Sequence, residues 1–169
     1  MDKRGLCGFE ESIIRGDLTY RMEKVLYVAF RGINNSSYQL VRQMNGAAFY
    51  ITNSFTGVRR DIDSLPASYE KIIMFGLDKD LHEAIRFERV AQKNGDQIFT
   101  GMDLTPYLYR AKQHDVPYTI SEIPTTYLCN EAYFYMMRKM KCSVLLIHIP
   151  SMPHMSNDFW VRLKKIFER

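Results

Sequence analysis

The chain has 169 residues, of which 46% are hydrophobic and 25% are charged. This length and balance are typical of one soluble globular domain with a sizeable core. The net charge of +4 is too small an excess to indicate a nucleic-acid-binding surface. No run reaches the roughly 18 apolar residues of a membrane span, so we expect neither nucleic acid nor membrane among the partners.

The three cysteines, Cys7, Cys129 and Cys142, are irregularly spaced and contain no Cys-x-x-Cys pair. A sparse, odd set favours a reducing compartment and argues against a disulfide framework or a zinc site. Residues 1–21 are polar and do not have the uninterrupted apolar core of a secretory signal. We therefore expect a cytoplasmic protein with a poorly ordered N-terminal extension at 1–21 and a single domain at 22–169.

Short apolar runs alternate with amphipathic segments along the rest of the chain. The runs typical of strands are 24–30, 47–51, 71–75 (closed by Gly76), 84–91, 117–120 and 143–149. Helices are expected after Asn35 or Ser36, within 57–69, from Asp103 or Thr105 to about His114, at 130–141, and after a cap in 156–158. Residues 93–96 (KNGD) form a strong turn signal.

Buried strands separated by single helices predict an α/β fold, a three-layer sandwich with a mostly parallel (mixed) central sheet flanked by helices. In such folds, functional sites gather at the carboxyl ends of the strands. Four residues of interest lie at strand ends or in the loops that follow them: Gly76, Glu88, Cys129 and His148.

Cys129 and His148 are the candidate reactive pair. Cys129 stands between a turn-like segment and an apolar helix, and His148 lies near the end of the apolar run 143–149. A cysteine attacks as the thiolate, and a neighbouring imidazole can take the thiol proton. The start of a helix also favours a thiolate, because free N–H groups and the helix dipole stabilise negative charge there. By default, however, each of these residues would simply be part of a core.

Four segments resemble pyroglutamyl peptidase I, also called pyrrolidone-carboxylate peptidase. Residues 120–130 resemble the family's S-N-T-A-G-T-F-V-C-N pattern around the nucleophilic cysteine, and 148–153 (HIPSMP) resemble its H-I-P-Y-x-P. Residues 88–91 (ERVA) match E-R-V-A-x-N, and 35–41 (NSSYQLV) resemble N-P-S-W-E-A-V. The segments occur in family order and span roughly 24–155.

The resemblance implies a cysteine exopeptidase with Cys129 as nucleophile, His148 as general base and acid, and Glu88 as the third catalytic residue. It implies a substrate peptide with a blocked or cyclic N-terminal residue, removed as pyroglutamate through a thioester acyl-enzyme. That chemistry requires no metal or organic cofactor. The family often forms homo-oligomers, so the resemblance implies such an assembly as well.

The parts that would bind the substrate depart from the family pattern. By position, the substrate-binding residues would be Phe30, Gly76 and Leu77. The family's G-F-x-P-F-G-G loop is shortened after Phe30, and its G-Q-A-G-G-R loop is replaced by 76–81 (GLDKDL). The family's D-A-R-I-P-D-N segment has no counterpart after 93–96, and its arginine is missing there.

Two other hypotheses follow from these departures. A divergent family member could bind a peptide end or a partner without cleaving it, since the substrate loops are altered. Alternatively, an unrelated α/β module could carry Cys129 as a purely structural residue, in which case its alkylation at neutral pH would be slow.

Overall fold

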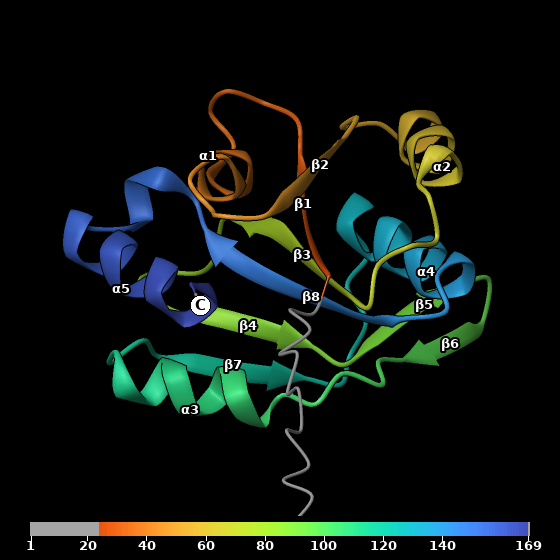
Figure 1. The fold of residues 1–169 in the computed structure, drawn as a ribbon. Coiled ribbons are helices and arrows are strands. Elements are labelled where there is room, and N and C mark those ends of the chain that lie inside the picture. Colours follow the sequence, from red (N-terminus) through yellow and green to blue (C-terminus); the bar gives the residue numbers. More distant parts are fainter. Residues whose placement is uncertain (1–23, 169) are drawn as a thin grey trace, which may run out of the picture.

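A computed structural model of the protein describes residues 24–168 (Figure 1). The strands are β1 (Val25–Phe30), β2 (Ala47–Ile51), β3 (Lys71–Asp78), β4 (Ile85–Glu88), β5 (Val90–Lys93), β6 (Asp96–Phe99), β7 (Tyr118–Ser121) and β8 (Ser143–Pro150). The helices are α1 (Ser36–Arg42), α2 (Phe55–Ser64), α3 (Thr105–Gln113), α4 (Leu128–Lys139), α5 (Asn157–Phe167) and the short 3-10 helix η1 (Met152–His154).

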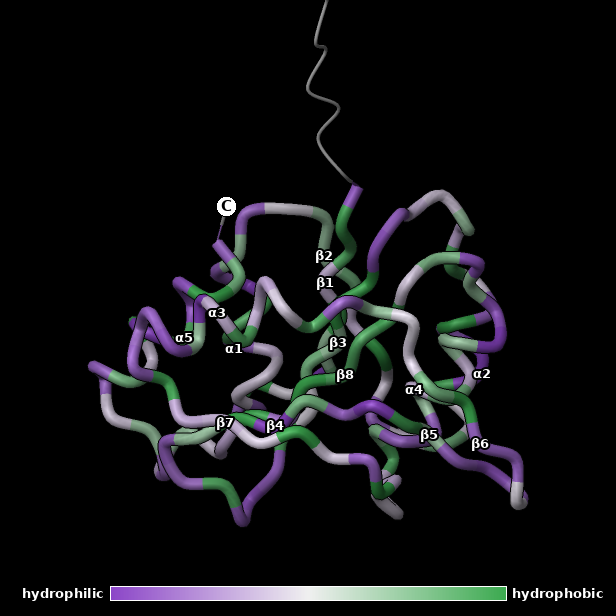
Figure 2. Tube along the Cα trace, turned by 90° about the horizontal axis from the view of Figure 1, so that it is seen from below, coloured by the Kyte–Doolittle hydropathy of each residue, from purple (hydrophilic) through white to green (hydrophobic). Residues whose placement is uncertain are grey.

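Six strands form one sheet in the order β2-β1-β3-β8-β4-β7, and β5 and β6 form a separate hairpin. Neighbouring strands of the sheet are parallel except β4 and β8, which are antiparallel. The predicted α/β sandwich with a mostly parallel, mixed sheet is therefore confirmed. The central strands β3 and β8 are almost wholly apolar because both of their faces are covered (Figure 2).

The two faces of the sheet bury two separate hydrophobic clusters. Helices α1, α3 and α5 cover one face with side chains such as Leu40, Ala111 and Phe159. Helices α2 and α4, together with the hairpin, cover the other face with side chains such as Ile62, Tyr133 and Ala91. Side chains alternate along each strand, so each strand of the centre contributes to both clusters.

Helix caps fix where several elements begin. Asn35 caps α1, and its side chain accepts a hydrogen bond from the Ser37 N–H, which settles the choice between Asn35 and Ser36. Ser156 caps α5 in the expected way. The predicted side-chain cap of α3 is wrong: Leu104 stands at the cap position and makes no such bond, although Asp103 accepts from the Thr105 N–H just before the helix.

Two predicted strands need correction, and one strand was missed. β3 continues through Gly76 to Asp78, because β8 pairs with it along its whole length. The single strand predicted at 84–91 is two strands, since the chain leaves the central sheet at Arg89 and β5 turns to pair with β6. The turn at 93–96 thus joins a hairpin whose second strand, β6, the sequence pattern did not indicate.

The predicted extension at 1–21 lies outside the described residues. Across 24–168, no helix is long and apolar enough to cross a membrane.

Candidate active site

The candidate residues share one face of the sheet. His148 on β8 pairs with Gly76 on β3 and, on its other side, with Arg86 on β4. Residues two apart on a strand point to the same side, so Asp78 follows Gly76 and Glu88 follows Arg86 onto this face. Helix α4 covers the same face and brings Cys129 over it. Three adjacent strands and one helix therefore build the site (Figure 1).

Glu88 orients the imidazole of His148. Its Oε1 lies 2.7 Å from His148 Nδ1, and both side chains are almost completely buried. The Tyr133 hydroxyl on α4 donates to the Glu88 backbone carbonyl at 3.0 Å, which fixes the strand beneath the carboxylate. An ionised carboxylate accepts only, so Nδ1 carries the proton of this bond, and in a neutral imidazole Nε2 then keeps its lone pair. The sequence alone allowed Glu88 to face solvent; the structure buries it.

Gly76 leaves the space in which Cys129 and His148 meet. A Cβ at Gly76 would lie 2.9 Å from Cys129 Sγ and 2.9 Å from His148 Nε2. The sulfur and the ring nitrogen therefore border the same small gap. Nε2 is buried and makes no hydrogen bond to any residue of the described chain. In unliganded enzymes such catalytic contacts are often loose and tighten when the substrate binds.

The Cys129 thiol is protonated in this arrangement. Burial raises its pKa to about 12, although the backbone N–H groups of Cys129 and Leu77 lower it, and the carboxylates of Glu88 and Asp78 raise it further. The N–H groups near the helix start favour the thiolate, as expected, but desolvation of the sulfur outweighs them. A proton acceptor is needed when the sulfur attacks, and the free Nε2 of His148 adjoins it.

Hydrogen bonds between α4 and the hairpin fix the first turn of the helix. Cys129 is the second residue of α4, because the helix begins at Leu128, two residues before the predicted start at Asn130. The Asn130 amide donates to the Gln92 carbonyl at 2.7 Å and accepts from the Gln92 N–H at 2.9 Å. The cap residue Tyr127 makes no side-chain hydrogen bond to the helix, and its carbonyl accepts from the Asn130 N–H, at 3.0 Å. The N–H groups of Leu128 and Cys129 are therefore the candidates to bind a ligand.

A hollow of about 490 Å³ opens beside Cys129. Phe30 and Leu77, two of the predicted substrate-binding residues, line it, whereas Gly76 lies behind the sulfur and the imidazole. The lining residues are Phe30, Asn35, Asn53, Leu77, Asp78, Lys79, Asp80, Tyr127, Leu128 and Cys129. The size suits a small organic group.

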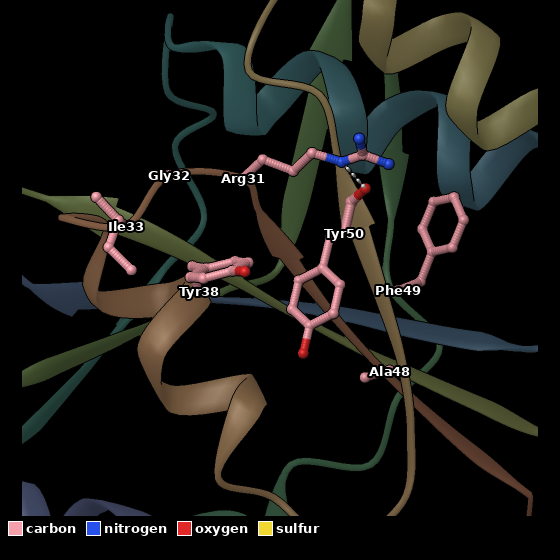
Figure 3. Close-up of a pocket in the computed structure, with 7 residues that line it drawn as sticks. All are labelled: Arg31, Gly32, Ile33, Tyr38, Ala48, Phe49 and Tyr50. Atoms are coloured by element: carbon pink, nitrogen blue, oxygen red, sulfur yellow. Dashed lines mark hydrogen bonds between the residues drawn. The ribbon is translucent and has the colours of Figure 1, made fainter.

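A second hollow, of about 440 Å³, lies on the other side of the loop after β1 (Figure 3). Arg31 spans its rim, and its Nε donates to the Tyr50 carbonyl at 2.9 Å. The Tyr38 and Tyr50 rings approach each other there, with centroids 5.0 Å apart. None of the candidate catalytic residues lines this hollow, so it is not part of the candidate site.

Sequence reasoning missed Arg86 and Asp78. Arg86 donates to Glu88 Oε1 and to Asp78 Oδ2, each at 2.7 Å. The spacing of Arg86 and Glu88 on one strand was a usable signal, because it places both on one face. Asp78 was not predicted to face the site, because the strand at 71–75 was expected to end at Gly76, before Asp78.

The described residues contain no group of three or more histidine, cysteine or acidic side chains placed to hold a metal ion. Cys129 and Cys142 are both free thiols. Cys7 lies outside the described residues.

No family model matches the chain, and a search of the curated proteins finds no significant match. Solved structures do match. Pyroglutamyl peptidase I from Bacillus amyloliquefaciens is similar over 86% of this chain and 91% of its own, with a TM-score of 0.70 and 18% identity. The chain has the fold of pyroglutamyl peptidase I.

Two further solved structures agree. Pyrrolidone carboxyl peptidase from Thermus thermophilus matches 85% of this chain and 98% of its own, with a TM-score of 0.71 and 15% identity. A mutant pyrrolidone carboxyl peptidase from Pyrococcus furiosus matches 85% and 95%, with a TM-score of 0.69 and 16% identity. The resemblance predicted from four short segments is thus confirmed at the level of the fold.

Proposed function

We propose that the protein is a cysteine exopeptidase that removes an N-terminal pyroglutamyl residue from peptides. The observation that carries this proposal is the convergence of Cys129 Sγ and His148 Nε2 on the gap over Gly76, with Glu88 bound to the far side of the imidazole. Nucleophile, base and orienting carboxylate in this order are the parts of a thiol acyl-transfer site. The likeness of the fold to peptidases supports the same class of reaction.

In the acylation step, His148 Nε2 takes the proton of the Cys129 thiol as the sulfur attacks the carbonyl carbon of the pyroglutamyl residue. Glu88 stabilises the imidazolium that forms, through its bond to Nδ1. When the tetrahedral intermediate collapses, the carbon–nitrogen bond breaks and the leaving amine takes the proton from Nε2. The pyroglutamyl group remains on sulfur as a thioester.

In the deacylation step, water attacks the thioester carbonyl while Nε2 accepts one of its protons. The carbon–sulfur bond then breaks, and the proton returns to the departing sulfur, which restores the thiol. The N–H groups of Leu128 and Cys129 at the start of α4 would donate to the carbonyl oxygen as it gains negative charge. A buried thiol with a pKa of about 12 makes this assistance by His148 essential.

The wall of the hollow supports a pyroglutamyl residue as substrate. Phe30, Leu77 and Leu128 give it an apolar side next to Cys129. A lactam ring has no charged amino group, so it enters such a wall at a lower desolvation cost than an ordinary N-terminal ammonium does. Gly76 lets the sulfur and the imidazole lie against the strand behind them, because a side chain there would clash with both.

A second candidate function is binding of a blocked peptide end without cleavage. The observation that favours it is the protonated thiol of Cys129, which makes no hydrogen bond to His148 Nε2. The hollow would then hold the peptide end, and Cys129 would not attack it.

Cleavage of a fluorogenic pyroglutamyl amide tests the proposal, with the matching alanyl amide as a control for selectivity. We expect the pyroglutamyl amide alone to be hydrolysed, Cys129→Ala to abolish turnover, and Cys142→Ala to retain it. Undiminished turnover in Cys129→Ala would exclude the nucleophile. Saturable binding of a pyroglutamyl peptide by calorimetry, without any product, would support the binding function instead.

A further inference from the structure

Glu88 has a second strong partner besides His148. The Nε of Arg86 donates to Glu88 Oε1 at 2.7 Å, and this is the oxygen that His148 Nδ1 contacts at 2.7 Å. On its other side, Arg86 Nη2 donates to Asp78 Oδ2 at 2.7 Å. The four side chains form one continuous line, Asp78–Arg86–Glu88–His148, and the reaction proposed above uses only its last two members.

The sheet fixes this line from its backbone. Arg86 pairs with His148 across the antiparallel strands β4 and β8, and Asp78 lies on β3, on the far side of β8. All four residues point to the face that α4 covers. Arg86 therefore reaches across β8 from β4 toward β3, so its guanidinium is held at both ends by groups from different strands.

The line is largely shielded from water. Side-chain exposure is 7% for Asp78, 23% for Arg86, 2% for Glu88 and 0% for His148. Burial works against the charge on Arg86, but the carboxylates of Glu88 and Asp78 outweigh it and raise the pKa of Arg86 above its ordinary value. Burial likewise works against the charge of Asp78, but the Asp80 N–H and the Arg86 guanidinium lower its pKa overall. Arg86 and Asp78 are thus both charged at neutral pH.

Partly buried charges at hydrogen-bond distance influence one another strongly, because little solvent screens them. The cation of Arg86 weakens the pull of Glu88 on a proton at His148. Without it, two carboxylates would act on the site unopposed, the imidazole would hold its proton to higher pH, and Nε2 would be unavailable to the thiol.

We propose that Arg86 is a positioning residue that aims Glu88 Oε1 at His148 and keeps the imidazole free to accept the Cys129 proton at neutral pH, with Asp78 as the anchor of Arg86. The proposal rests on the proposed function, in that it assigns His148 the role of base. It extends that function, because it adds a residue that sets the pH range in which His148 can act as a base.

The two carboxylate–arginine contacts predict opposite effects when each is removed. Arg86→Gln deletes a positive charge and should favour a proton on the Glu88–His148 pair. Asp78→Asn deletes a negative charge and should disfavour it. A merely structural role, in which Arg86 ties β3 to β4, would change both variants in the same direction through loss of stability.

The test is the pH dependence of Cys129 alkylation by iodoacetamide in a chain whose other two cysteines are replaced, Cys7→Ala and Cys142→Ala. The measurement needs no peptide substrate, so a failure to cleave pyroglutamyl amides and a failure of this inference are separate results. The acid limb of the profile reports the ionisation that makes the sulfur reactive.

We expect Arg86→Gln to move the acid limb to higher pH by about one unit and to slow alkylation at neutral pH about tenfold. Arg86→Lys should restore most of the rate, and Asp78→Asn should move the limb to lower pH. Arg162→Gln is the matched control, because Arg162 also bonds a carboxylate, at 2.8 Å, but that of Asp158, which is 78% exposed and lies on α5, in the helix layer over the other face of the sheet. Its profile should be unchanged.

An unshifted limb in folded Arg86→Gln would overturn the proposal, as would shifts of the same sign in Arg86→Gln and Asp78→Asn. If Arg86→Gln does not fold, the sign of the shift in Asp78→Asn decides: a shift to lower pH supports the proposal, and no shift or a shift to higher pH overturns it. Thermal unfolding of each variant establishes which of them are folded.

Discussion

Glu88 and His148 lie 60 residues apart in the chain, and their side chains meet at 2.7 Å in the interior of the protein. The strands that carry them, β4 and β8, are the one antiparallel pair of the central sheet. Because a paired backbone fixes both residues, the imidazole is oriented before any substrate arrives. The Cys129 thiol must lose its proton before it can attack, because burial keeps it protonated at neutral pH.

Glu88→Gln tests the orientation of the base. The amide has the shape of the carboxylate but no charge, and it cannot stabilise an imidazolium at Nδ1. We expect kcat for a pyroglutamyl amide to fall roughly 10³- to 10⁴-fold, with KM little changed. Glu83→Gln is the control, because the Glu83 carboxylate accepts from the Ser156 N–H at 3.0 Å on the exposed surface, away from the imidazole and from α4. A loss of less than tenfold in Glu88→Gln would contradict the assigned role.

The sequence pattern was sufficient to predict the strands and helices whose positions depend on local periodicity and composition. The apolar runs predicted β2 with its observed bounds and β8 to within one residue, and the Ser156 cap located α5. These features depend on local propensity and on burial of a whole strand, which can be read from neighbouring residues.

What the sequence could not supply depends on contacts between distant segments. β3 passes through Gly76 because β8 lies beside it, and no local signal shows that pairing. The protonated state of the Cys129 thiol follows from desolvation of the sulfur in the folded chain, whereas the helix start alone favours the opposite state. The bond from Arg86 to Asp78 requires knowing that β3 and β4 flank the same strand.

Alkaline pH should reveal the buried thiol as a loss of stability. In the folded chain, the pKa of Cys129 is raised from 9.0 to about 12. Between these values the unfolded chain has released the proton and the folded chain still holds it, so stability falls as pH rises. Relative to Cys129→Ala, we expect the wild-type free energy of unfolding to drop by at most about 1.4 kcal/mol per pH unit above pH 9.

Urea unfolding at a series of pH values measures this difference. Subtracting Cys129→Ala removes the contribution of the other groups that titrate in the same range. A difference that stays constant from pH 8 to pH 11 would show that the thiol ionises with an ordinary pKa in the folded chain.

Gly76→Ala tests the gap between the sulfur and the imidazole. The added Cβ would stand 2.9 Å from Cys129 Sγ and from His148 Nε2, closer than side-chain carbons pack. The ring is held by Glu88, so we expect the sulfur to be displaced, turnover and Cys129 alkylation to fall at least tenfold, and stability to fall by about 1–3 kcal/mol. Gly101→Ala is the matched control, because a Cβ there meets nothing within 4 Å. Equal activity in the two variants would show that the gap is not needed.

Asn130→Ala tests the attachment of the first turn of α4. The Asn130 side chain makes two hydrogen bonds to the Gln92 backbone, at 2.7 and 2.9 Å, directly next to Cys129. Their loss leaves a partly buried N–H and carbonyl unpaired, so we expect a cost of about 1–3 kcal/mol in the free energy of unfolding. Turnover should fall further than stability explains, because the sulfur is then no longer held against His148.

Gln97→Ala is the matched control for Asn130→Ala. Gln97 also bonds Gln92, at 3.0 Å, but through an exposed side-chain pair that does not involve the helix. Its loss should cost less than about 0.5 kcal/mol and leave turnover unchanged. Urea unfolding and pyroglutamyl amide cleavage are measured on both variants at the same pH. Full turnover in Asn130→Ala, together with the expected loss of stability, would mean that the hairpin supports the fold without positioning Cys129.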